Sequence, residues 1–572
     1  NISIRGVGTL TGDASPLYIV DGFEVSDIDY LSNSDIESIQ VLKDASSSAI
    51  YGARAANGVV LITTKSGKSG KPIVTYNGSA TYRKISKTLD LLSPYEFVKL
   101  QGEVKPELLT GYYQEGNDAD GTPYRYQSLD DYIGLSGVDW QGETFNPTWS
   151  QDHNFSLMGG SDNTKYNASF SRYIENGIFK NSGFDKTTAK FRLDQKINKK
   201  VSFNVTVNYA QTNRKGTGTS GDSGRFNMLA QILSARPTGG LKLTDEALLE
   251  SAIDPEMLET GESLAQVNPV KQTESVTNNK RAEMWSANGA LTWEIIKGLT
   301  FKTAGTYNTT NNRIDIFYKD GSKEAYRNGQ KPYGRTQMGR DVRWSNNNTL
   351  TWKQKIQKHN YDIMLGHEVS YRNSEHLLGE AMDFPFDNLG NNNLGLGAVP
   401  SKVESGYSEK MLLSFFARAN YSYNNRYLLT ATVRADGSTV FSQKNKWGFF
   451  PSFSAAWRVS EEKFWEPIRG WFDNFKLRAS YGSLGNQALD ESRYGNFPYL
   501  ATYGINTKYG ALLNGTRPVA VSVPGLVSAS FTWETVNQID FGFDASFFGG
   551  RLNTSFDWYR RNTKDMLTAG QA

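Results

Sequence analysis

Cysteine is absent from this 572-residue chain, and so are long apolar runs. Without cysteine the chain can hold neither a disulfide framework nor a cysteine-ligated zinc site. No stretch approaches 18 consecutive apolar residues, so the sequence predicts no transmembrane helix, and any part that spans a membrane must do so as a closed β-barrel. The 62 basic and 59 acidic residues nearly cancel, so we expect no nucleic-acid partner.

Catalytic motifs are equally scarce. The four histidines form neither an HExxH motif nor another zinc spacing, and no GxSxG nucleophile elbow occurs. Paired carboxylates carry no signal of their own among 59 acidic residues. We therefore expect no enzyme, no metal site and no cofactor.

Aromatic residues, in contrast, are abundant in a chain that is only 38% hydrophobic. Aromatics make up 13% of the sequence, with 30 tyrosines, 30 phenylalanines and 12 tryptophans. A disordered chain would not carry so many. Many short strands with one polar and one apolar face would give this profile.

Alternation with a period of two residues runs through most of the chain after Pro72. In 201–209, for example, valine, phenylalanine and tyrosine occupy the odd positions, and serine, asparagine and threonine the even ones. The pattern predicts about fifteen strands, near 72–84, 151–160, 164–176, 184–196, 201–212, 281–294, 299–316, 338–353, 359–373, 407–423, 427–437, 447–459, 475–485, 534–547 and 551–565.

The connections between these strands alternate in length. Short ones lie at 161–163, 198–200, 424–426 and 548–550. The others are long, at 85–150, 213–280, 317–337, 374–406 and 486–533, or modest, near 177–183 and 438–446. A soluble sandwich has no reason to gather its long loops at one end, whereas an outer-membrane barrel has short periplasmic turns and long outer loops.

Tryptophans and charged residues help to assign the two faces. Tryptophans near strand ends predict interfacial girdles, and cross-strand packing in a soluble sheet is the alternative: Trp149, Trp285, Trp293, Trp344, Trp352, Trp447, Trp457, Trp533 and Trp558. Lys190, Arg192 and Asp194 share one face of a strand. A cationic side chain facing lipid at the midplane costs about 2–4 kcal/mol, so we assign this face to the lumen.

The first 70 residues read differently, as a small α+β unit. Ser34 or Asp35 is expected to cap a helical turn, and Asp44 to cap a second one that runs to Ala49. Ile39 to Leu42 predicts a short buried strand, and Val59 to Ile62 a strand buried on both faces. The unit is small for an independent fold, so a small soluble domain stays the alternative on composition alone.

Three segments of this unit, Ile2-Ser3-Ile4-Arg5-Gly6, Pro16 to Gly22 and Asp35 to Val60, resemble the plug signature of the SusC/RagA family of TonB-dependent outer-membrane transporters. The segments 413–457, 475–486 and 533–567 resemble that family's barrel strands. The signature positions are Gly6, Asp21, Gly22, Asp35, Glu37, Lys43, Asp44, Tyr51, Gly52, Asn57 and Gly58.

The resemblance implies a mainly β fold: an antiparallel transmembrane β-barrel, formed by 72–572, with a plug domain, 1–71, inside its lumen. The protein would lie in the outer membrane, with its loops outside and the plug facing the periplasm. Its function would be TonB-dependent import of a polar nutrient, with oligosaccharide the first expectation and peptide the alternative. Implied partners are membrane lipid, a SusD-like surface lipoprotein and the TonB–ExbB–ExbD complex.

The ends of the chain fall inside this pattern. Asn1 lies within the plug signature, so we expect the signal peptide, any N-terminal extension, the TonB-contacting segment and the first part of the plug to precede it. Fifteen strands with two free edges cannot sit in a bilayer, and large plugged transporters have about 22 strands. We therefore expect about one third of the barrel to follow the C-terminus.

Two arginines and four glycines are the candidate plug residues. The resemblance implies that Arg5 and Arg54 lock the plug to glutamates of the barrel, with Glu294 and Glu368 as candidates; solvation in a wet lumen is the alternative. The glycines at 6, 22, 52 and 58 predict turns or close backbone approaches, with a phosphate-cradling loop as the alternative.

Tyrosines in the first long loop are the candidate substrate contacts. Rings could stack on sugars there, while neighbouring aspartates, Asp118, Asp120 and Asp130, accept hydroxyl protons; packing of the loop on itself is the alternative. The tyrosines are Tyr112, Tyr113, Tyr124, Tyr126 and Tyr132. A soluble β-rich surface-binding protein and a glycan-active β-sheet enzyme remain rival classes for the whole chain.

Overall fold

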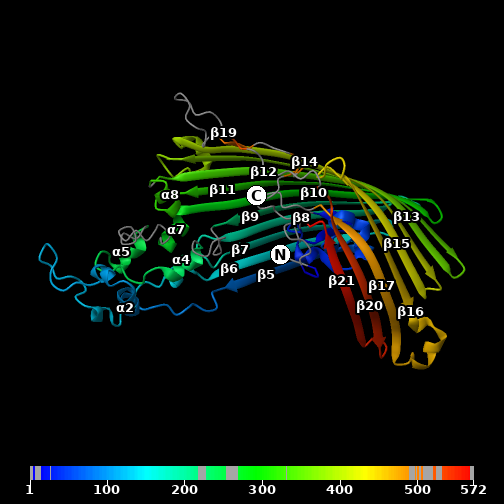
Figure 1. The fold of residues 1–572 in the computed structure, drawn as a ribbon, viewed down its shortest axis with the longest axis horizontal. Coiled ribbons are helices and arrows are strands. Elements are labelled where there is room, and N and C mark those ends of the chain that lie inside the picture. The colour runs from blue at the N-terminus through cyan, green and yellow to red at the C-terminus, as the bar shows by residue number, and fades with distance from the viewer. Residues whose placement is uncertain are drawn as a thin grey trace.

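One large antiparallel sheet dominates the structure (Figure 1). The computed structural model describes residues 4–6, 15–25, 28–216, 227–252, 268–329, 331–487, 496–497, 499–500, 504–506, 520–522 and 531–566. Ile2 and Ser3 of the first signature segment lie outside these residues. The large sheet holds fifteen strands in sequence order, with β5 and β21 at its two edges.

All fifteen predicted strands are present. They are β5 (Gly70–Arg83), β6 (Thr148–Gly160), β7 (Thr164–Asn176), β8 (Gly183–Lys196), β9 (Val201–Lys215), β10 (Val276–Ile296), β11 (Leu299–Tyr318), β12 (Tyr333–Ile356), β13 (His359–Met382), β14 (Val399–Tyr423), β15 (Tyr427–Ser438), β16 (Trp447–Arg458), β17 (Phe472–Asn486), β20 (Glu534–Phe547) and β21 (Leu552–Lys564). The short strands β18 (Gly504–Asn506) and β19 (Ala520–Ser522) pair apart from this sheet.

The predicted bounds are wrong mainly at the loop ends of the long central strands. β13 continues to Met382 and β14 begins at Val399, well beyond the alternating segments. The added residues are mixed in polarity on both faces, as in the stretch 399–406, so no period of two marks them. Backbone pairing there continues without an apolar face to signal it.

The long connections gather at one end of the sheet, on the left in Figure 1. They contain α2 (Pro94–Val104), η3 (Pro106–Gly111), η4 (Leu129–Tyr132), α3 (Trp140–Thr144), α4 (Met228–Ser234), α5 (Asp245–Glu250), α7 (Pro269–Ser275), α8 (Lys323–Arg327) and η6 (Gly390–Leu396). At the other end the connection from β16 to β17 is not a short turn, because it folds into η7 (Val459–Glu461) and η8 (Lys463–Ile468). Within the described part of the chain, no helix combines the length and the apolarity needed to cross a membrane.

A second, four-stranded sheet forms the N-terminal unit, which we call the small sheet. Its strands are β1 (Leu17–Val20), β2 (Phe23–Val25), β3 (Ile36–Leu42) and β4 (Val59–Thr64), in the order β2-β1-β4-β3. Its helical turns are η1 (Asn33–Asp35), α1 (Ala45–Ser48) and η2 (Ala49–Arg54). The structure thus confirms a mainly β fold with an α+β region at the N-terminus.

The local expectations for the small sheet are confirmed in part. Asp44 caps α1 by accepting the Ser47 backbone N–H at 2.8 Å, and β4 is central and buried as expected. The cap expected at Ser34 or Asp35 is wrong, because η1 ends at Asp35 and has no side-chain cap. The expected burial of β3 is also wrong: Ile39 is 56% exposed, since β3 is the edge strand.

The small sheet packs through apolar side chains on one face of the large sheet, which we call the inner face. Val20, Val60 and Ile62 form one buried cluster with Ala210 of β9 and Met284 of β10. Ile62 is only 2% exposed. This cluster fixes the position of the small sheet over β9 and β10.

The opposite, outer face carries the exposed aromatic residues. Of the nine tryptophans considered, eight are at least 36% exposed, whereas Trp533 is 4% exposed. The predicted girdle position is wrong for Trp533, which packs against Phe441 in the loops. Trp285 and Trp293 are eight residues apart on β10, about 26 Å along the strand or about 20 Å in height after tilt, near the roughly 25 Å of an outer-membrane apolar band.

Ile62→Ala tests the apolar packing of the small sheet. Removing buried methyl groups should cost about 2–5 kcal/mol of docking free energy. We expect faster protease cleavage within the small sheet of the full-length protein. Ile39→Ala makes the same change at an exposed position and should leave cleavage unchanged; equal effects of the two would contradict this account.

Candidate functional site

The candidate site is the interface between the small sheet and the inner face of the large sheet. On the β7–β8 side it is polar. Ser169 donates to the Asp35 carboxylate at 2.9 Å, and Arg192 forms an ion pair with Asp21 at 3.1 Å. Lys190 donates to the hydroxyl of Thr64. The prediction that Lys190 and Arg192 face the interior is confirmed.

The turn between β1 and β2 presents Asp21 to this side. Asp21 and Gly22 both have positive φ, 52° and 88°, which reverses the chain tightly. The Asp21 carboxylate also accepts the backbone N–H of Thr64 at 2.8 Å, so it ties β1 to β4 as well as to β8. Two signature residues therefore build one anchoring point.

Arg5 contacts the other edge of the large sheet. Its guanidinium lies 2.5 Å from the Asp540 carboxylate of β20 and 4.2 Å from the ring centre of Tyr559 on β21. The resemblance implied a glutamate, but the partner is an aspartate. Whether this pair acts as a lock stays a prediction.

Arg54 lies in a charge network between the small sheet and the middle of the large one. Its guanidinium contacts Glu24 of β2 at 2.5 Å and Glu368 of β13 at 2.7 Å. Glu368 also contacts Arg434 of β15 at 3.0 Å, and Arg434 contacts Asp436 at 2.6 Å. Arg434 and Asp436 are almost completely buried.

Of the two expected glutamate partners, only Glu368 contacts Arg54. Glu294 lies at the turn end of β10, where its carboxylate accepts the backbone N–H of Gly298 at 3.4 Å. Sequence reasoning missed Arg434 and Asp436. Their signal was present: two opposite charges two residues apart share one face of a strand.

Burial and neighbouring charges shift the pKa values of Glu24 and Arg54 in opposite directions. Burial raises the pKa of Glu24, and the cations Arg54 and Arg343 oppose that shift only in part. Burial lowers the pKa of Arg54, but the carboxylates of Glu24 and Glu368 outweigh it, so the pKa of Arg54 lies above its usual value. Arg54 therefore stays charged, and Glu24 is the small-sheet member whose protonation is favoured.

Gly52 lets the backbone approach Arg434. It has a φ of 68°, and a Cβ added there would lie 2.1 Å from Nε of Arg434. Arg434 uses this proximity to donate to the backbone carbonyl of Ile50 at 2.8 Å. Gly6, Gly22 and Gly58 also have positive φ, so the expected turns are confirmed.

The remaining signature residues lie around the same unit. Lys43 pairs with Asp557 of β21 at 2.8 Å, and Asn57 accepts a hydrogen bond from Arg561 of β21 at 3.3 Å. Tyr51 packs partly buried within the small sheet, and Glu37 is exposed on β3. Among the described residues, no group of three or more acidic or histidine side chains could hold a metal ion.

The tyrosine-rich loop packs largely on itself. Tyr112 and Tyr132 are buried, and the Tyr132 hydroxyl donates to the Tyr112 carbonyl at 2.5 Å. Tyr126 lies against Tyr132 with ring centres 4.2 Å apart, and Tyr113 and Tyr124 are half-buried. Tyr112 and Tyr132 therefore have no ring face open to a sugar here, while a substrate role for Tyr113, Tyr124 and Tyr126 stays a prediction.

The nearby aspartates divide between turn formation and solvent. Asp118 accepts backbone N–H groups of Asp120 and Thr122 at 3.0 and 2.9 Å, which closes a local turn. Asp120 and Asp130 are exposed. The carboxylate of Asp118 therefore has hydrogen-bond partners within the turn and needs no ligand to satisfy it.

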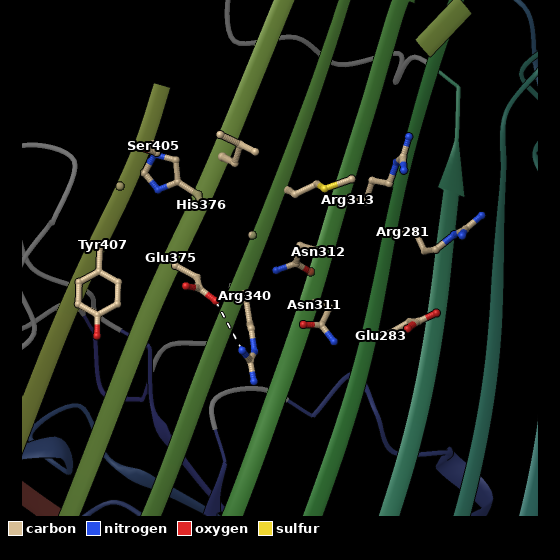
Figure 2. Close-up of a pocket in the computed structure, with 14 residues that line it drawn as sticks. Arg281, Glu283, Asn311, Asn312, Arg313, Arg340, Glu375, His376, Ser405 and Tyr407 are labelled. Atoms are coloured by element: carbon tan, nitrogen blue, oxygen red, sulfur yellow. Dashed lines mark ion pairs between the residues drawn. The ribbon is translucent and has the colours of Figure 1, made fainter. Parts of the chain in front are cut away.

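A large hollow lies away from this interface, on β10 to β14 (Figure 2). It measures about 810 Å³ and is lined by Arg281, Glu283, Arg340, Glu375 and Tyr407, among others. Arg340 and Glu375 form an ion pair at 3.7 Å. By strand alternation these five side chains share the outer face with the exposed tryptophans, so the hollow does not belong to the interface.

A smaller cavity of about 360 Å³ does border the interface. Glu24 and Arg54 line it on the side of the small sheet, and Arg343, Arg372 and Lys410 line it on the side of the large sheet. All five of these side chains are ionisable. The cavity is the space from which a solute would meet the charge network.

Two family models match the chain. The model described as "TonB dependent receptor-like, beta-barrel" matches residues 262–572, and the one described as "TonB-dependent Receptor Plug Domain" matches residues 1–59. Together they cover the small sheet as far as the first residue of β4, and β10 to β21 of the large sheet.

Several curated relatives match over nearly all of this chain. TonB-dependent receptor P3 of Formosa agariphila is 29% identical over 571 residues, which cover 99% of this chain and 52% of the relative. TonB-dependent receptor SusC of Bacteroides thetaiotaomicron is 28% identical over 600 residues, covering 99% and 55%. The chain thus spans about half the length of these relatives.

Solved structures share the fold. The RagAB peptide transporter superposes with a TM-score of 0.81 at 25% identity, covering 99% of this chain and 63% of that one. A mutant of the ferric enterobactin receptor PfeA from Pseudomonas aeruginosa gives a TM-score of 0.54 at 14% identity, covering 99% and 65%, which shows the fold alone.

Gly52→Ala, compared with Gly22→Ala, tests the close approach to Arg434. Both changes put a side chain at a positive φ, which costs about 1–2 kcal/mol. Only at position 52 does the new Cβ meet a neighbour, since nothing lies within 4 Å of the corresponding point at Gly22. We expect Gly52→Ala to lower the thermal midpoint clearly more than Gly22→Ala; equal shifts would contradict a role for the contact.

Glu24→Gln tests the titration of the network. Because the docked state holds the Glu24 proton more tightly, docking should gain stability as pH falls through the raised pKa and lose it as pH rises. Protease protection of the small sheet should therefore increase as the pH is lowered toward 4.5, the ordinary pKa of a glutamate. Glu24→Gln should flatten this dependence, and Glu37→Gln, at an exposed position, should not.

Proposed function

Because the chain belongs to the TonB-dependent receptor family, and within it to the SusC/RagA group, we propose that it imports a polar nutrient across the outer membrane with energy delivered through TonB. The protein is an outer-membrane β-barrel protein of this family, whose members are transporters. In the proposal, residues 1–71 act as the plug domain and residues 72–572 as barrel wall. One observation carries the proposal: a small charged unit is docked on the polar inner face of a large sheet.

The arrangement of contacts supports a plug that is held firmly but reversibly. Apolar packing on β9 and β10 supplies non-directional attraction. The ion pairs of Arg5, Arg54 and Lys43 reach β20, β13 and β21. A pull from the periplasmic side would separate these charges one after another and open a passage beside the plug.

The proposed cargo is an oligosaccharide, and a peptide is the alternative. Serine, threonine and asparagine line the inner face of several strands, for example Thr206, Asn208 and Ser286, which are buried while the small sheet is docked. In an open passage such groups would hydrogen-bond to either cargo. One relative is named SusC and one similar structure is a peptide transporter. We propose a SusD-like surface lipoprotein over the long loops as the partner that delivers the cargo.

Uptake in the native host tests the proposal. A strain that lacks the gene should fail to grow on one class of oligosaccharide or of peptide, and the complete gene should restore growth. Removing TonB should abolish the restored uptake. Growth on every tested glycan and peptide without the gene would count against import and favour a surface-binding role.

Arg54→Ala, set beside Lys43→Ala, tests the proposed lock. Removing one partner of a buried pair costs about 3–5 kcal/mol, whereas an exposed pair contributes about 1 kcal/mol or less. The Arg54 side chain is 19% exposed and that of Lys43 is 51% exposed. We expect Arg54→Ala to admit a large antibiotic and to impair uptake. Unchanged permeability and uptake would end the lock hypothesis.

A further inference from the structure

Polar side chains interrupt the apolar outer face of the large sheet on β11 to β13. On β12 the apolar band runs from Trp344 to Trp352, and Asn346 and Asn348 lie inside it on the same face. The corresponding positions hold only apolar or aromatic residues on β9, β14, β15 and β16, at the odd positions of 201–209, 411–421, 429–435 and 447–457. A polar side chain at this depth is costly beside lipid, so we expect a different neighbour here.

Four side chains form what we call the polar patch: Thr303 of β11, Asn346 and Asn348 of β12, and His367 of β13. Asn348 donates to the side chain of Asn346 at 2.6 Å, and Asn346 donates to the backbone carbonyl of Ala304 at 3.2 Å. Among the described residues, the amide oxygen of Asn348 receives no hydrogen bond. An amide that has both a donor and an acceptor to offer can pair with the same amide of a second copy.

Two glycines beside the polar patch leave room for a close approach. Gly289 of β10 is directly opposite Gly305 of β11, and Gly305 is directly opposite Asn346. A Cβ added at either glycine would lie no closer than 3.6 Å to its surroundings, and neither has a positive φ, so the fold itself does not require glycine there. Glycine inside a strand weakens it and often marks a site where another backbone comes near.

Nearer the loops, the same strands carry charges of both signs around the hollow of about 810 Å³ (Figure 2). Arg281 of β10 lies four residues beyond Trp285, and Glu375 of β13 lies four residues beyond Tyr371. These two charges therefore stand at about the same height above the aromatic residues, with β11 and β12 between them. Arg281 is exposed and has no ion pair among the described residues, while Glu375 is 46% exposed and lies 3.7 Å from Arg340.

Other charges around the hollow have partners within the chain. Arg313 pairs with Asp315 at 2.7 Å, and Glu283 accepts a hydrogen bond from Gln211 at 3.2 Å. Arg281 is thus the cation that a second molecule can pair. A carboxylate has two oxygens, so Glu375 can accept from a second cation while it contacts Arg340.

We propose that the outer surface of β10 to β13 is a contact face between two copies of this protein in the membrane, related by a twofold axis between β11 and β12. Such an axis places β10 of one copy beside β13 of the other, so Arg281 meets Glu375 of the partner subunit twice in each pair. The surface lies at least five strands from either edge of the sheet, so strands added at β5 or β21 would not cover it. This inference goes beyond the proposed function, because import by a single copy does not require it.

Cysteine crosslinking in isolated outer membranes tests the contact. The 572-residue chain contains no cysteine, so each variant of the full-length protein is made with one cysteine at a chosen place. Asn346→Cys lies close to the axis and should give a crosslinked dimer on mild oxidation. Phe453→Cys is the matched control, since it lies inside the apolar band of β16, is 50% exposed and is four strands from β12. It should stay monomeric.

Charge reversal tests the pairing itself. Arg281→Glu alone, or Glu375→Arg alone, brings like charges together at both ends of the contact, so each should lower the Asn346→Cys crosslink yield about tenfold. The two single variants, produced together with different tags, should crosslink to each other, because every contact between them joins opposite charges. Arg335→Glu makes the same change on the inner face of β12 and should leave the yield unchanged.

The inference is overturned if Asn346→Cys crosslinks no better than Phe453→Cys, or if the two charge-reversed variants crosslink to each other no better than to themselves. A lipid that co-purifies with the native monomer and is lost from Arg281→Glu would overturn it in favour of a lipid site. If a charge-reversed variant fails to resist protease as the native protein does, the comparison of the two cysteine variants carries the test alone.

Uptake is measured in the same strains. Normal uptake without a crosslinked dimer overturns only this inference. Crosslinked dimers without energised uptake count against the proposed function alone.

Discussion

The need of interior charges for partners governs how the two sheets fit together. The inner face of the large sheet carries Arg192, Glu368, Arg434 and Asp540, and the small sheet presents a group of opposite charge to three of them. Arg434 instead has its partners within the large sheet and meets the small sheet through the Ile50 carbonyl. A charge left alone at such depth would cost several kcal/mol. The position of the small sheet therefore depends on the charged residues of the large sheet as much as on those of the small sheet.

Two kinds of contact, apolar packing and ion pairs, hold the small sheet against the large sheet. The apolar cluster over β9 and β10 resists separation over its whole area, because every displacement exposes hydrocarbon to water. The ion pairs toward β13 and toward β20 and β21 are short-ranged, and water can replace each partner once the pair opens. The unit is thus held by a broad apolar contact on one side and by separable charges on the other, as the proposed plug movement requires.

Much of this arrangement was predictable from the sequence. The period of two located every strand of the large sheet, because one face meets an apolar and the other a polar environment. It failed beyond Asn373 on β13, where both faces mix polar and apolar residues, and at the edge strand β3, where no element covers Ile39. Trp533 was misplaced because a tryptophan near a strand end can also turn into the loops. The sequence offered Glu294 and Glu368 as partners of Arg54. Only the folded structure shows that Glu368 is the one that lies beside it.

The length of the central strands has a consequence for what can reach the small sheet. Lys410 and Arg372 lie beside Met411 and Tyr371, yet β13 continues to Met382 and β14 starts at Val399, so about 33 Å of strand rises beyond them. Under the proposed function, a solute that enters from the loop end would pass along this length of strand before it reaches the small sheet. In such a transporter this depth would favour slender, flexible chains, which can thread end-first, over compact bodies of equal mass.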